Sequence, residues 1–459
     1  MVELGQTVEA AHAPTPTNDS EAILFRQLYE TLTELDCEGN LRGRLAERWE
    51  PDADARVWMV TLAPRRFWDG SALRAQDVVA SWRTSALRVG VGRSPFCWVR
   101  PDRMRAIDDR RIEVALPAPM RDFPRVLAHP ALAVASPRPG ATWPVGSGTF
   151  MIAQATTGQL SCPPNPYASP AGMSERAPRL TIRMKTGSDP RDLAGQEPVV
   201  RRVWSRKAVS FLATRGLQVE RLPWSRRYVL LLPDPVALTL DRSDIATVVA
   251  DAEAEPTAML GWKDAPCVEL ALPSDVEAGS AQEQSTGSET DSSASDGGSP
   301  GATERRLEVW SIANDPDAMR IAERVAARAS ASLAKAVVSN PVESIPFYST
   351  LRAGRALAFV VAIPEELETT CEAPGELTTD APWLLDGWDQ WRRLAHPAGA
   401  SGGSPAELER YLIESARVVP ILRTGASLVS RPGLVGVRID GSGLPRFGRA
   451  GWSGGSPLP

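Results

Sequence analysis

The sequence predicts an α/β protein built from two or three lobes, and three observations support this class. The chain has 459 residues, which is too long for one ordinary domain. Its hydrophobic fraction of 43% is enough to form sizeable cores. Strand and helix signals alternate along it, and the strand–helix–strand order after residue 305 is typical of an α/β lobe.

Short β-branched runs mark the strands of the first half. Residues 57–62 and 111–116 alternate partly between apolar and polar side chains, as half-buried strands do. Pro and Gly residues between these runs indicate turns. Residues 21–32 instead carry apolar side chains at helical spacing, so we expect a helix there.

The second half predicts a βαβ unit. Residues 307–310 are a strand, and Asp315-Pro316 offers a helix N-cap followed by a proline in the first turn. Apolar residues then recur at helical spacing, and residues 356–362 are a second apolar strand. A capping box at Ser404-Pro405-Ala406-Glu407 predicts a further helix, and residues 418–422 lead into short strands.

Residues 277–304 differ in composition from the rest of the chain. They consist almost wholly of Gly, Ser, Ala, Thr, Gln and acidic residues, with six carboxylates and no aromatic side chain. Such a segment buries too little apolar surface to offset the entropy lost on ordering. We therefore expect a disordered insertion there.

Composition argues against several classes of function. The net charge of −5 is modest for this length, so we expect no nucleic-acid partner. Five cysteines are scattered without C-x-x-C spacing and three histidines lie far apart, so we expect no metal site and no cofactor. The best apolar run, residues 228–232, is strand-sized, and no run reaches the roughly 18 residues that a membrane helix needs.

Motifs over about 60 residues of the first half resemble one known family, the family 5 solute-binding proteins. These are the oligopeptide, dipeptide and nickel binding components of ABC importers. The motifs, in chain order, are Tyr29-Glu30-Thr31-Leu32, Gly39-Asn40-Leu41, Leu45-Ala46-Glu47-Arg48-Trp49, Phe67-Trp68-Asp69-Gly70-Ser71 and residues 73–82. Gly146-Ser147-Gly148-Thr149-Phe150 is similar to the segment with which that family re-enters its first lobe. The tryptophans of the early motifs, Trp49, Trp58, Trp68 and Trp82, are expected in the core.

The resemblance implies a periplasmic-binding-protein-like, two-lobed hinge fold with an extra small subdomain in the first lobe. Lobe I is then expected to comprise residues 1–30, 146–225 and 416–459, with residues 31–145 inserted as the subdomain. Lobe II is expected to comprise residues 226–415 and to contain the insertion 277–304.

The resemblance also implies a function. It indicates an extracytoplasmic solute-binding component of an ABC importer that captures a peptide-like or other small solute in an interlobe cleft by hinge closure. The expected partners are this solute and the ABC permease subunits, and the protein is expected to be a monomer without a membrane span. A periplasmic or extracellular, membrane-associated location assumes a missing signal peptide, because residues 1–6 lack the pattern of one.

Six residues are candidates for ligand contact. Thr17, Asn18 and Asp19 match the extended segment that lies along the ligand in oligopeptide-binding relatives, although Asn18 or Asp19 could instead cap a helix. In lobe II, peptide-binding relatives use an Asp near a Trp after a strand like residues 359–362. Neither follows here; Glu365 or Glu366 could substitute, but an exposed loop is the expectation we favour for this segment. Trp383 and Asp386 form a second aromatic–acid group. Peptide specificity therefore stays open.

Two other classes of function compete with solute binding. Residues 399–403 match G-x-S-x-G, but they follow Pro397 instead of a strand, so we expect a loop there and no catalytic residue. The second alternative is a diverged protein that keeps this fold but acts as a sensor or protein-interaction module without transport.

Overall fold

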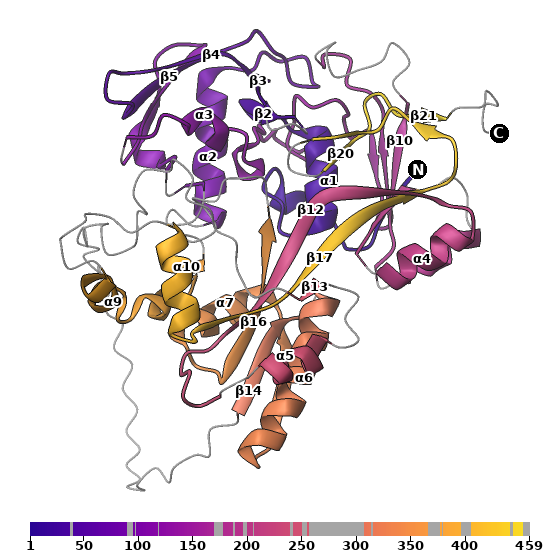
Figure 1. Ribbon diagram of the computed structural model, residues 1–459. Coiled ribbons are helices and arrows are strands. Elements are labelled where there is room, and N and C mark those ends of the chain that lie inside the picture. Colours follow the sequence, from indigo (N-terminus) through magenta and orange to yellow (C-terminus); the bar gives the residue numbers. More distant parts are fainter. Residues whose placement is uncertain are drawn as a thin grey trace, which may run out of the picture.

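The computed structural model shows a chain folded into two lobes that are joined by long strands (Figure 1). It describes residues 1–36, 40–89, 95–96, 98–117, 119–168, 178–186, 189–195, 200–204, 206–238, 242–249, 255–256, 307–313, 315–365, 377–378, 380–395, 405–440 and 444–452. The expected disordered insertion at 277–304 and the G-x-S-x-G segment lie outside these residues. So do four of the five cysteines, whereas Cys162 is buried with a free thiol.

In the described part of the chain, one mixed sheet of eleven strands extends through both lobes, in the order β15-β14-β16-β12-β17-β11-β1-β10-β9-β8, with β13 paired to β17. Its strands are β1 (Val2–Leu4), β8 (Gln154–Ala155), β9 (Gln159–Cys162), β10 (Leu180–Met184), β11 (Val200–Val203), β12 (Gln218–Leu231), β13 (Glu255–Pro256), β14 (Leu307–Ile312), β15 (Val337–Val342), β16 (Ala358–Glu365) and β17 (Val418–Ser430). The mixture of parallel and antiparallel pairs agrees with the α/β class predicted from the sequence.

Helix α1 (Asp19–Leu28) lies at the centre of lobe I. It begins two residues before the predicted helix because the Asn18 side chain accepts a hydrogen bond from the Glu21 amide, which confirms the capping alternative for Asn18. It ends four residues earlier than predicted, because the backbone of Glu30 pairs with Val134 as a β-bridge. Helix α4 (Arg206–Thr214) and the 3-10 turns η1 (Ala10–His12) and η5 (Pro190–Gly195) also belong to this lobe.

The C-terminal segment returns to lobe I and packs on α1. It forms two short hairpins, in which β18 (Leu434–Val435) pairs with β21 (Gly451–Trp452) and β19 (Arg438–Ile439) with β20 (Pro445–Arg446). The Gln27 amide donates to the Pro445 carbonyl at 2.7 Å, and Arg26 pairs with Asp440 at 2.6 Å. These buried polar contacts fix the last segment of the chain against the first helix.

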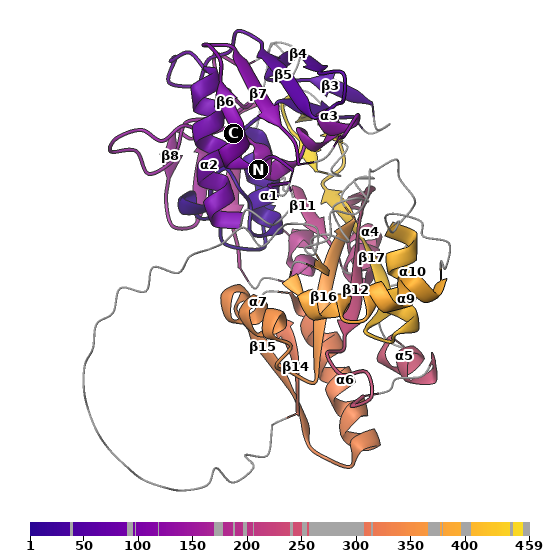
Figure 2. The same cartoon turned by 90° about the vertical axis from the view of Figure 1, so that its left-hand side faces the viewer.

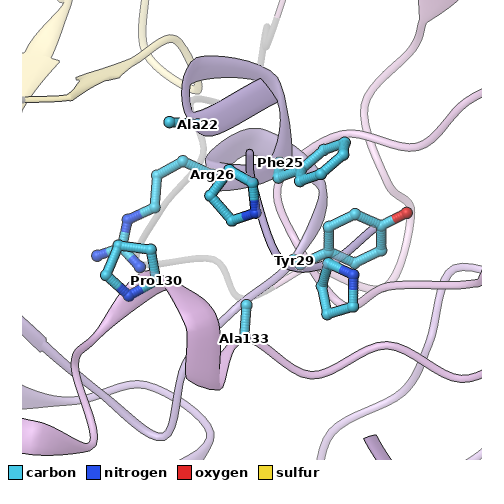
Figure 3. Close-up of a pocket in the computed structure, with 8 residues that line it drawn as sticks. Ala22, Phe25, Arg26, Tyr29, Pro130 and Ala133 are labelled. Atoms are coloured by element: carbon cyan, nitrogen blue, oxygen red, sulfur yellow. The ribbon is translucent and has the colours of Figure 1, made fainter. Parts of the chain in front are cut away.

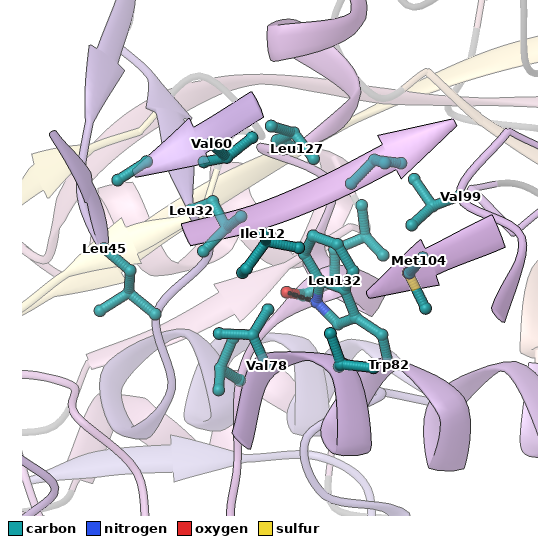
Figure 4. Packing of buried hydrophobic residues seen from close by; sticks show 14 of the residues in the cluster. Leu32, Leu45, Val60, Val78, Trp82, Val99, Met104, Ile112, Leu127 and Leu132 are labelled. Carbon is teal, nitrogen blue, oxygen red and sulfur yellow. Dashed lines mark hydrogen bonds between the residues drawn. The ribbon is translucent and has the colours of Figure 1, made fainter. Parts of the chain in front are cut away.

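A separate four-stranded sheet forms the subdomain of lobe I. Its order is β4 (Ala46–Pro51), β5 (Val57–Leu62), β7 (Arg111–Ala115) and β6 (Met104–Ala106), beside the pair β2 (Thr33–Leu35) and β3 (Leu41–Gly43). Helices α2 (Ala75–Val89) and α3 (Phe123–Val126) and the turns η2 (Pro101–Arg103) and η3 (Pro130–Leu132) complete it. Figure 4 shows its core, where the indole of Trp82 donates to the Leu132 carbonyl at 2.8 Å.

The family-like motifs of the first half supply the framework of this subdomain. Trp58 and Trp82 are buried, and Trp49 and Trp68 pack partly buried against the same core, as predicted. The Asp69-Gly70 turn between β5 and α2 needs glycine, because Gly70 has a φ of +85°. The Asp69 carboxylate accepts bonds from the amide and hydroxyl of Ser71, which closes that turn.

Lobe II contains the predicted βαβ unit. Strand β14 leads into α6 (Pro316–Leu333), which the carboxylate of Asp315 caps as expected, and α6 returns to β15, which is parallel to β14. The remaining helices are α5 (Arg242–Val249), α7 (Ser344–Ala353), α9 (Trp388–Ala395) and α10 (Pro405–Glu414), with η7 (Pro382–Leu385). The two faces of the sheet carry separate apolar cores, one under α6 and one under α7, α9 and α10. Figure 2 shows these helices around the strands of lobe II.

Strands β12 and β17 cross between the lobes side by side (Figure 1). Leu222 of β12 packs in the lobe I core and Tyr228 in the lobe II core. On β17, Leu422 still packs in the lobe II core and Ala426 already packs in the lobe I core. The chain therefore passes from lobe II to lobe I between these residues, later than the boundary at 415/416 expected from the sequence. A register shift between Arg221 and Ser225 interrupts their pairing at this crossing, so the ladder is weakest where the lobes meet.

Candidate functional site

On the lobe I side of this crossing, the first residue of α1 presents a carboxylate. Asp19 follows the N-cap residue Asn18, where the helix dipole favours a negative charge. Its Oδ2 lies 3.0 Å from Nη2 of Arg202 and accepts a hydrogen bond from the indole nitrogen of Trp204 at 2.9 Å. Arg202 belongs to β11 and Trp204 is the first residue after that strand, so one segment of lobe I holds the carboxylate at the start of α1.

Arg226 reaches Asp19 from β12, just beyond the register shift. Its backbone pairs with Pro364 of the lobe II strand β16 and with Thr424 of β17, which lies at the crossing. Its Nη2 forms a close ion pair with Oδ1 of Asp19. The guanidinium also lies over the ring of Trp204, 4.4 Å from its centroid.

On the lobe II side, Asp315 faces the same arginine. Its carboxylate caps α6 by accepting from the amides of Asp317 and Ala318, each at 3.1 Å. It also accepts from the hydroxyl of Tyr228 at 3.0 Å and lies 3.6 Å from Nη1 of Arg226. We call Asp19, Arg202, Trp204, Arg226, Tyr228 and Asp315 the interlobe cluster.

Burial and charge oppose each other in this cluster. Burial acts to raise the pKa of Asp19, but the charges of Arg202 and Arg226 and the bond from Trp204 outweigh it and leave the pKa below its usual value. For Arg226, burial acts to lower the pKa, and the facing Asp19 carboxylate more than offsets it. Burial, together with the charge of Asp315, holds the pKa of Tyr228 well above its usual value. At neutral pH Asp19 and Arg226 are therefore charged, and Tyr228 is neutral.

This arrangement is suited to holding polar groups, because it combines fixed charges of both signs with an aromatic ring at the interface of two lobes. Among the described residues, no group of three or more His, Cys, Asp or Glu side chains is placed to hold a metal ion. In the same residues, no helix is long and apolar enough to span a bilayer.

Thr17 and Asn18 contact the protein's own N-terminal loop. The amide and hydroxyl of Thr17 both donate to the Glu21 carboxylate at 2.8 Å. The Asn18 amide group donates to the carbonyl of Thr7 at 3.1 Å while its oxygen caps α1. Of the three candidates in this segment, Asp19 is the one that the structure brings into the interlobe cluster.

Glu365 is the last residue of β16, in a strand instead of an exposed loop. Its backbone pairs with Ser225 of β12, next to Arg226, so this position also lies at the lobe crossing. Its side chain is outside the described part of the structure.

Trp383 and Asp386 lie at the opposite end of lobe II. The Trp383 indole donates to the carbonyl of Leu351 at 2.7 Å, and the Asp386 carbonyl accepts from the hydroxyl of Tyr411. The guanidinium of Arg417 donates to the carbonyl of Trp383. The backbone carbonyl of Arg417 accepts from the amide of Leu232, at the far end of β12. That end is separated from Arg226 by roughly 17 Å of strand. The structure therefore does not bring these two residues together with Asp19.

Sequence reasoning missed Arg202, Trp204 and Arg226 as site residues. The sequence feature that could have identified the two arginines is a charged residue within a run that otherwise has the composition of a strand, at residues 200–204 and 226–232. Asp315 and Tyr228 were recognised only as a helix cap and a strand residue. Nothing in the sequence shows that these segments meet, because the contacts join positions more than 80 residues apart.

A small hollow lies inside lobe I, between α1 and η3, apart from the interlobe cluster (Figure 3). Its walls are mostly apolar and include Phe25, Tyr29 and Pro130. The one charged group that lines it, Arg26, donates to Asp440 and to the Thr31 hydroxyl. All the residues that line this hollow belong to lobe I, so it is not part of the interlobe cluster.

Comparison with known proteins connects this architecture to a family. Residues 40–167 match the family described as bacterial extracellular solute-binding proteins, family 5 middle. This segment is therefore similar to family 5 of the solute-binding proteins. It is 32% identical over 132 residues to the periplasmic oligopeptide-binding protein OppA of Escherichia coli strain K12, and the aligned stretch covers 24% of each chain. The sequence match thus spans about a quarter of that relative.

Solved structures of binding proteins match over nearly the whole length. NikA from Brucella suis, solved in complex with Fe(III)-EDTA, aligns with a TM-score of 0.67 at 15% identity, covering 98% of this chain and 99% of NikA. The murein tripeptide binding protein MppA of Escherichia coli aligns with a TM-score of 0.65 at 16% identity, covering 98% and 97%. These likenesses confirm the predicted two-lobed, periplasmic-binding-protein-like fold, including lobe II, where sequence similarity is weak.

Proposed function

We propose that this protein is the solute-binding component of an ABC importer, which captures a small polar solute between its two lobes. The family match over the subdomain and the fold match over the whole chain support this assignment. The observation that carries it is the interlobe cluster, in which charged side chains from both lobes converge at the strand crossing. Peptides and metal chelates are the first ligand classes to test, because family 5 structures include proteins bound to both.

Binding by closure requires that the ligand contact both lobes. Lobe I offers Asp19 and Trp204, and lobe II offers Asp315 and the end of β16 at Glu365. A ligand then shifts the protein toward the closed form by its greater affinity for that form. Moving the population from mostly open to mostly closed needs on the order of 5 kcal/mol of differential binding.

The cellular setting follows from this proposal. An importer component would work outside the cytoplasmic membrane as a monomer and deliver its solute to permease subunits. Proteins of this class bind without transforming their ligand, so the cluster would act as a recognition site with no catalytic role.

A thermal-shift screen tests the proposal. We expect the melting temperature to rise with at least one member of a panel of dipeptides, tripeptides, longer peptides, sugars and metal chelates. At 100 times its Kd, a ligand adds about 2.7 kcal/mol to the free energy of unfolding. No shift with any compound would contradict solute capture and favour a sensor or protein-interaction role.

For any compound that raises the melting temperature, two matched variants locate its binding site. Asp19→Asn should weaken its binding on the order of tenfold, because a charged partner at the interlobe cluster is removed. Asp386→Asn changes the same chemical group at the far end of lobe II and should leave the Kd unchanged. If Asp386→Asn weakens binding and Asp19→Asn does not, the ligand lies elsewhere.

A further inference from the structure

Arg226 is shared by acids that belong to different lobes. Asp19 is fixed in lobe I by Arg202 and by the indole of Trp204. Asp315 is fixed in lobe II by the first amides of α6 and by the hydroxyl of Tyr228. Each acid is thus held by its own lobe, and the guanidinium between them lies within ion-pair distance of both.

The position of Arg226 makes this contact a link across the hinge. Its backbone pairs with Pro364 of the lobe II strand β16 and with Thr424 at the crossing of β17, whereas Asp19 is part of lobe I. The register shift of β12 lies between Arg221 and Ser225, directly before it. On β17, Gly425 pairs with Ser225, and no atom lies within 4 Å of where its Cβ would be. The backbone is therefore weakly braced at the crossing, and side-chain contacts there have a large influence on the angle between the lobes.

The contact is strong enough to matter for that angle. The side chains of Arg226 and Asp19 are only 18% and 17% exposed, so solvent screens their attraction less than at a surface. The ring of Trp204 lies against the guanidiniums of both Arg202 and Arg226, which restricts the geometry of both. A charge-assisted hydrogen bond of this kind changes an equilibrium on the order of tenfold.

From these contacts we infer that Arg226 is a positioning residue that holds the two lobes together before a solute arrives. Both of its ion pairs are made with side chains of the protein itself, so the link needs no solute to form it. By raising the fraction of molecules in the binding-competent arrangement, it raises the apparent affinity for the solute by the same factor. This second consequence rests on the proposed function, whereas the first does not.

The test compares the radius of gyration of ligand-free variants by small-angle X-ray scattering. Arg226→Gln removes the charge and should increase the radius of gyration, because the fraction of open molecules rises on the order of tenfold. Arg226→Lys keeps the charge but loses the planar fork that reaches two acids, so its radius should lie between those of the native protein and Arg226→Gln.

Arg328→Gln is the matched control. It removes the same charge from an ion pair with Asp244 that lies entirely within lobe II. We expect it to lower stability while leaving the radius of gyration at the native value. An equal increase in Arg328→Gln and Arg226→Gln would show a general loosening of the fold and overturn the inference, as would native values in both Arg226 variants. If Arg226→Gln does not fold, the comparison of Arg226→Lys with the native protein decides.

The two proposals fail in different ways. A solute that binds with native affinity to Arg226→Gln, together with an unchanged radius of gyration, refutes the link and leaves solute capture intact. A larger radius in Arg226→Gln, with no solute bound by any variant, supports the link and refutes solute capture.

Discussion

At the scale of single residues, Asp19 has a double role that its position in the sequence only partly reveals. It was a candidate because it precedes the first helix, and the structure does place it at the lobe crossing. Its contacts, however, are with Arg202, Trp204 and Arg226, which come from β11, the residues that follow it and β12. A carboxylate this deeply placed needs such partners, because an unpaired buried charge is costly.

The lowered pKa of Asp19 predicts a pH-dependent contribution to stability. An acid whose folded pKa lies below its unfolded value of 3.8 stabilises the protein fully above that value and loses its contribution as the pH falls through the folded pKa. Asp19→Asn should therefore lower the free energy of unfolding by about 2 kcal/mol at pH 7. The difference from the native protein should shrink as the pH falls below 3.8. Urea unfolding followed by tryptophan fluorescence measures it.

The exposed Asp54 provides the comparison for this prediction. Asp54→Asn should stay within about 0.5 kcal/mol of the native protein at every pH. A cost of Asp19→Asn that is the same at pH 7 and pH 2 would show that the Asp19 charge does not stabilise the fold.

At the scale of elements, the loop at residues 146–150 shows why the family-like glycines are needed. The amide of Gly148 donates to the carbonyl of Leu28 at 2.9 Å, so this loop lies directly against the C-terminal end of α1. A Cβ on Gly146 would lie 2.1 Å from the Leu28 oxygen, and one on Gly148 would lie 2.4 Å from the Gln27 oxygen. Both contacts are with backbone, which does not move aside easily.

Gly146→Ala should therefore lower the free energy of unfolding by about 1–3 kcal/mol, the usual cost of overpacking. Gly158, in the turn between β8 and β9, has no atom within 4 Å of the place that an added methyl group would take. Gly158→Ala should change stability by less than about 0.5 kcal/mol. Equal melting temperatures for the two variants would mean that the loop is free to move away from α1.

Local patterns predicted the elements better than the site. Residues 57–62, the cap at Asp315 and the helix after it are governed by alternation and capping, which neighbouring residues determine, and they were predicted correctly. Helix α1 ends early because Glu30 bridges to Val134, a contact over more than 100 residues. Arg202 and Arg226 were missed for the same reason, since their importance depends on which strands flank β17. In the sequence, Trp383 and Asp386 resembled a ligand-binding pair, but their hydrogen-bond partners belong to the far end of lobe II.

At the scale of the whole molecule, the two largest sheets do not correspond to the two lobes. Strands β12 and β17 belong to the cores of both lobes, so the eleven-stranded sheet couples lobe I to lobe II. The subdomain has its own four-stranded sheet and its own core around Trp82, and Trp68 is one of the side chains that pack against both this core and that of lobe I. A cooperative unit follows a shared core, so unfolding should separate the subdomain from the rest before it separates the lobes from each other.

Calorimetry of two core variants tests this division. Trp82→Ala in the subdomain and Phe359→Ala in lobe II each remove a fully buried aromatic ring, at a cost of about 3–5 kcal/mol. We expect two transitions in the native protein, with Trp82→Ala lowering the midpoint of one and Phe359→Ala lowering the midpoint of the other. A probe at the interlobe cluster, such as the fluorescence of Trp204, should follow the transition that Phe359→Ala lowers, because β11 and β12 flank β17 in the same sheet. If both variants lower one common transition, the contacts made by Trp68 are enough to couple the subdomain to the lobes, and the protein unfolds as a single unit.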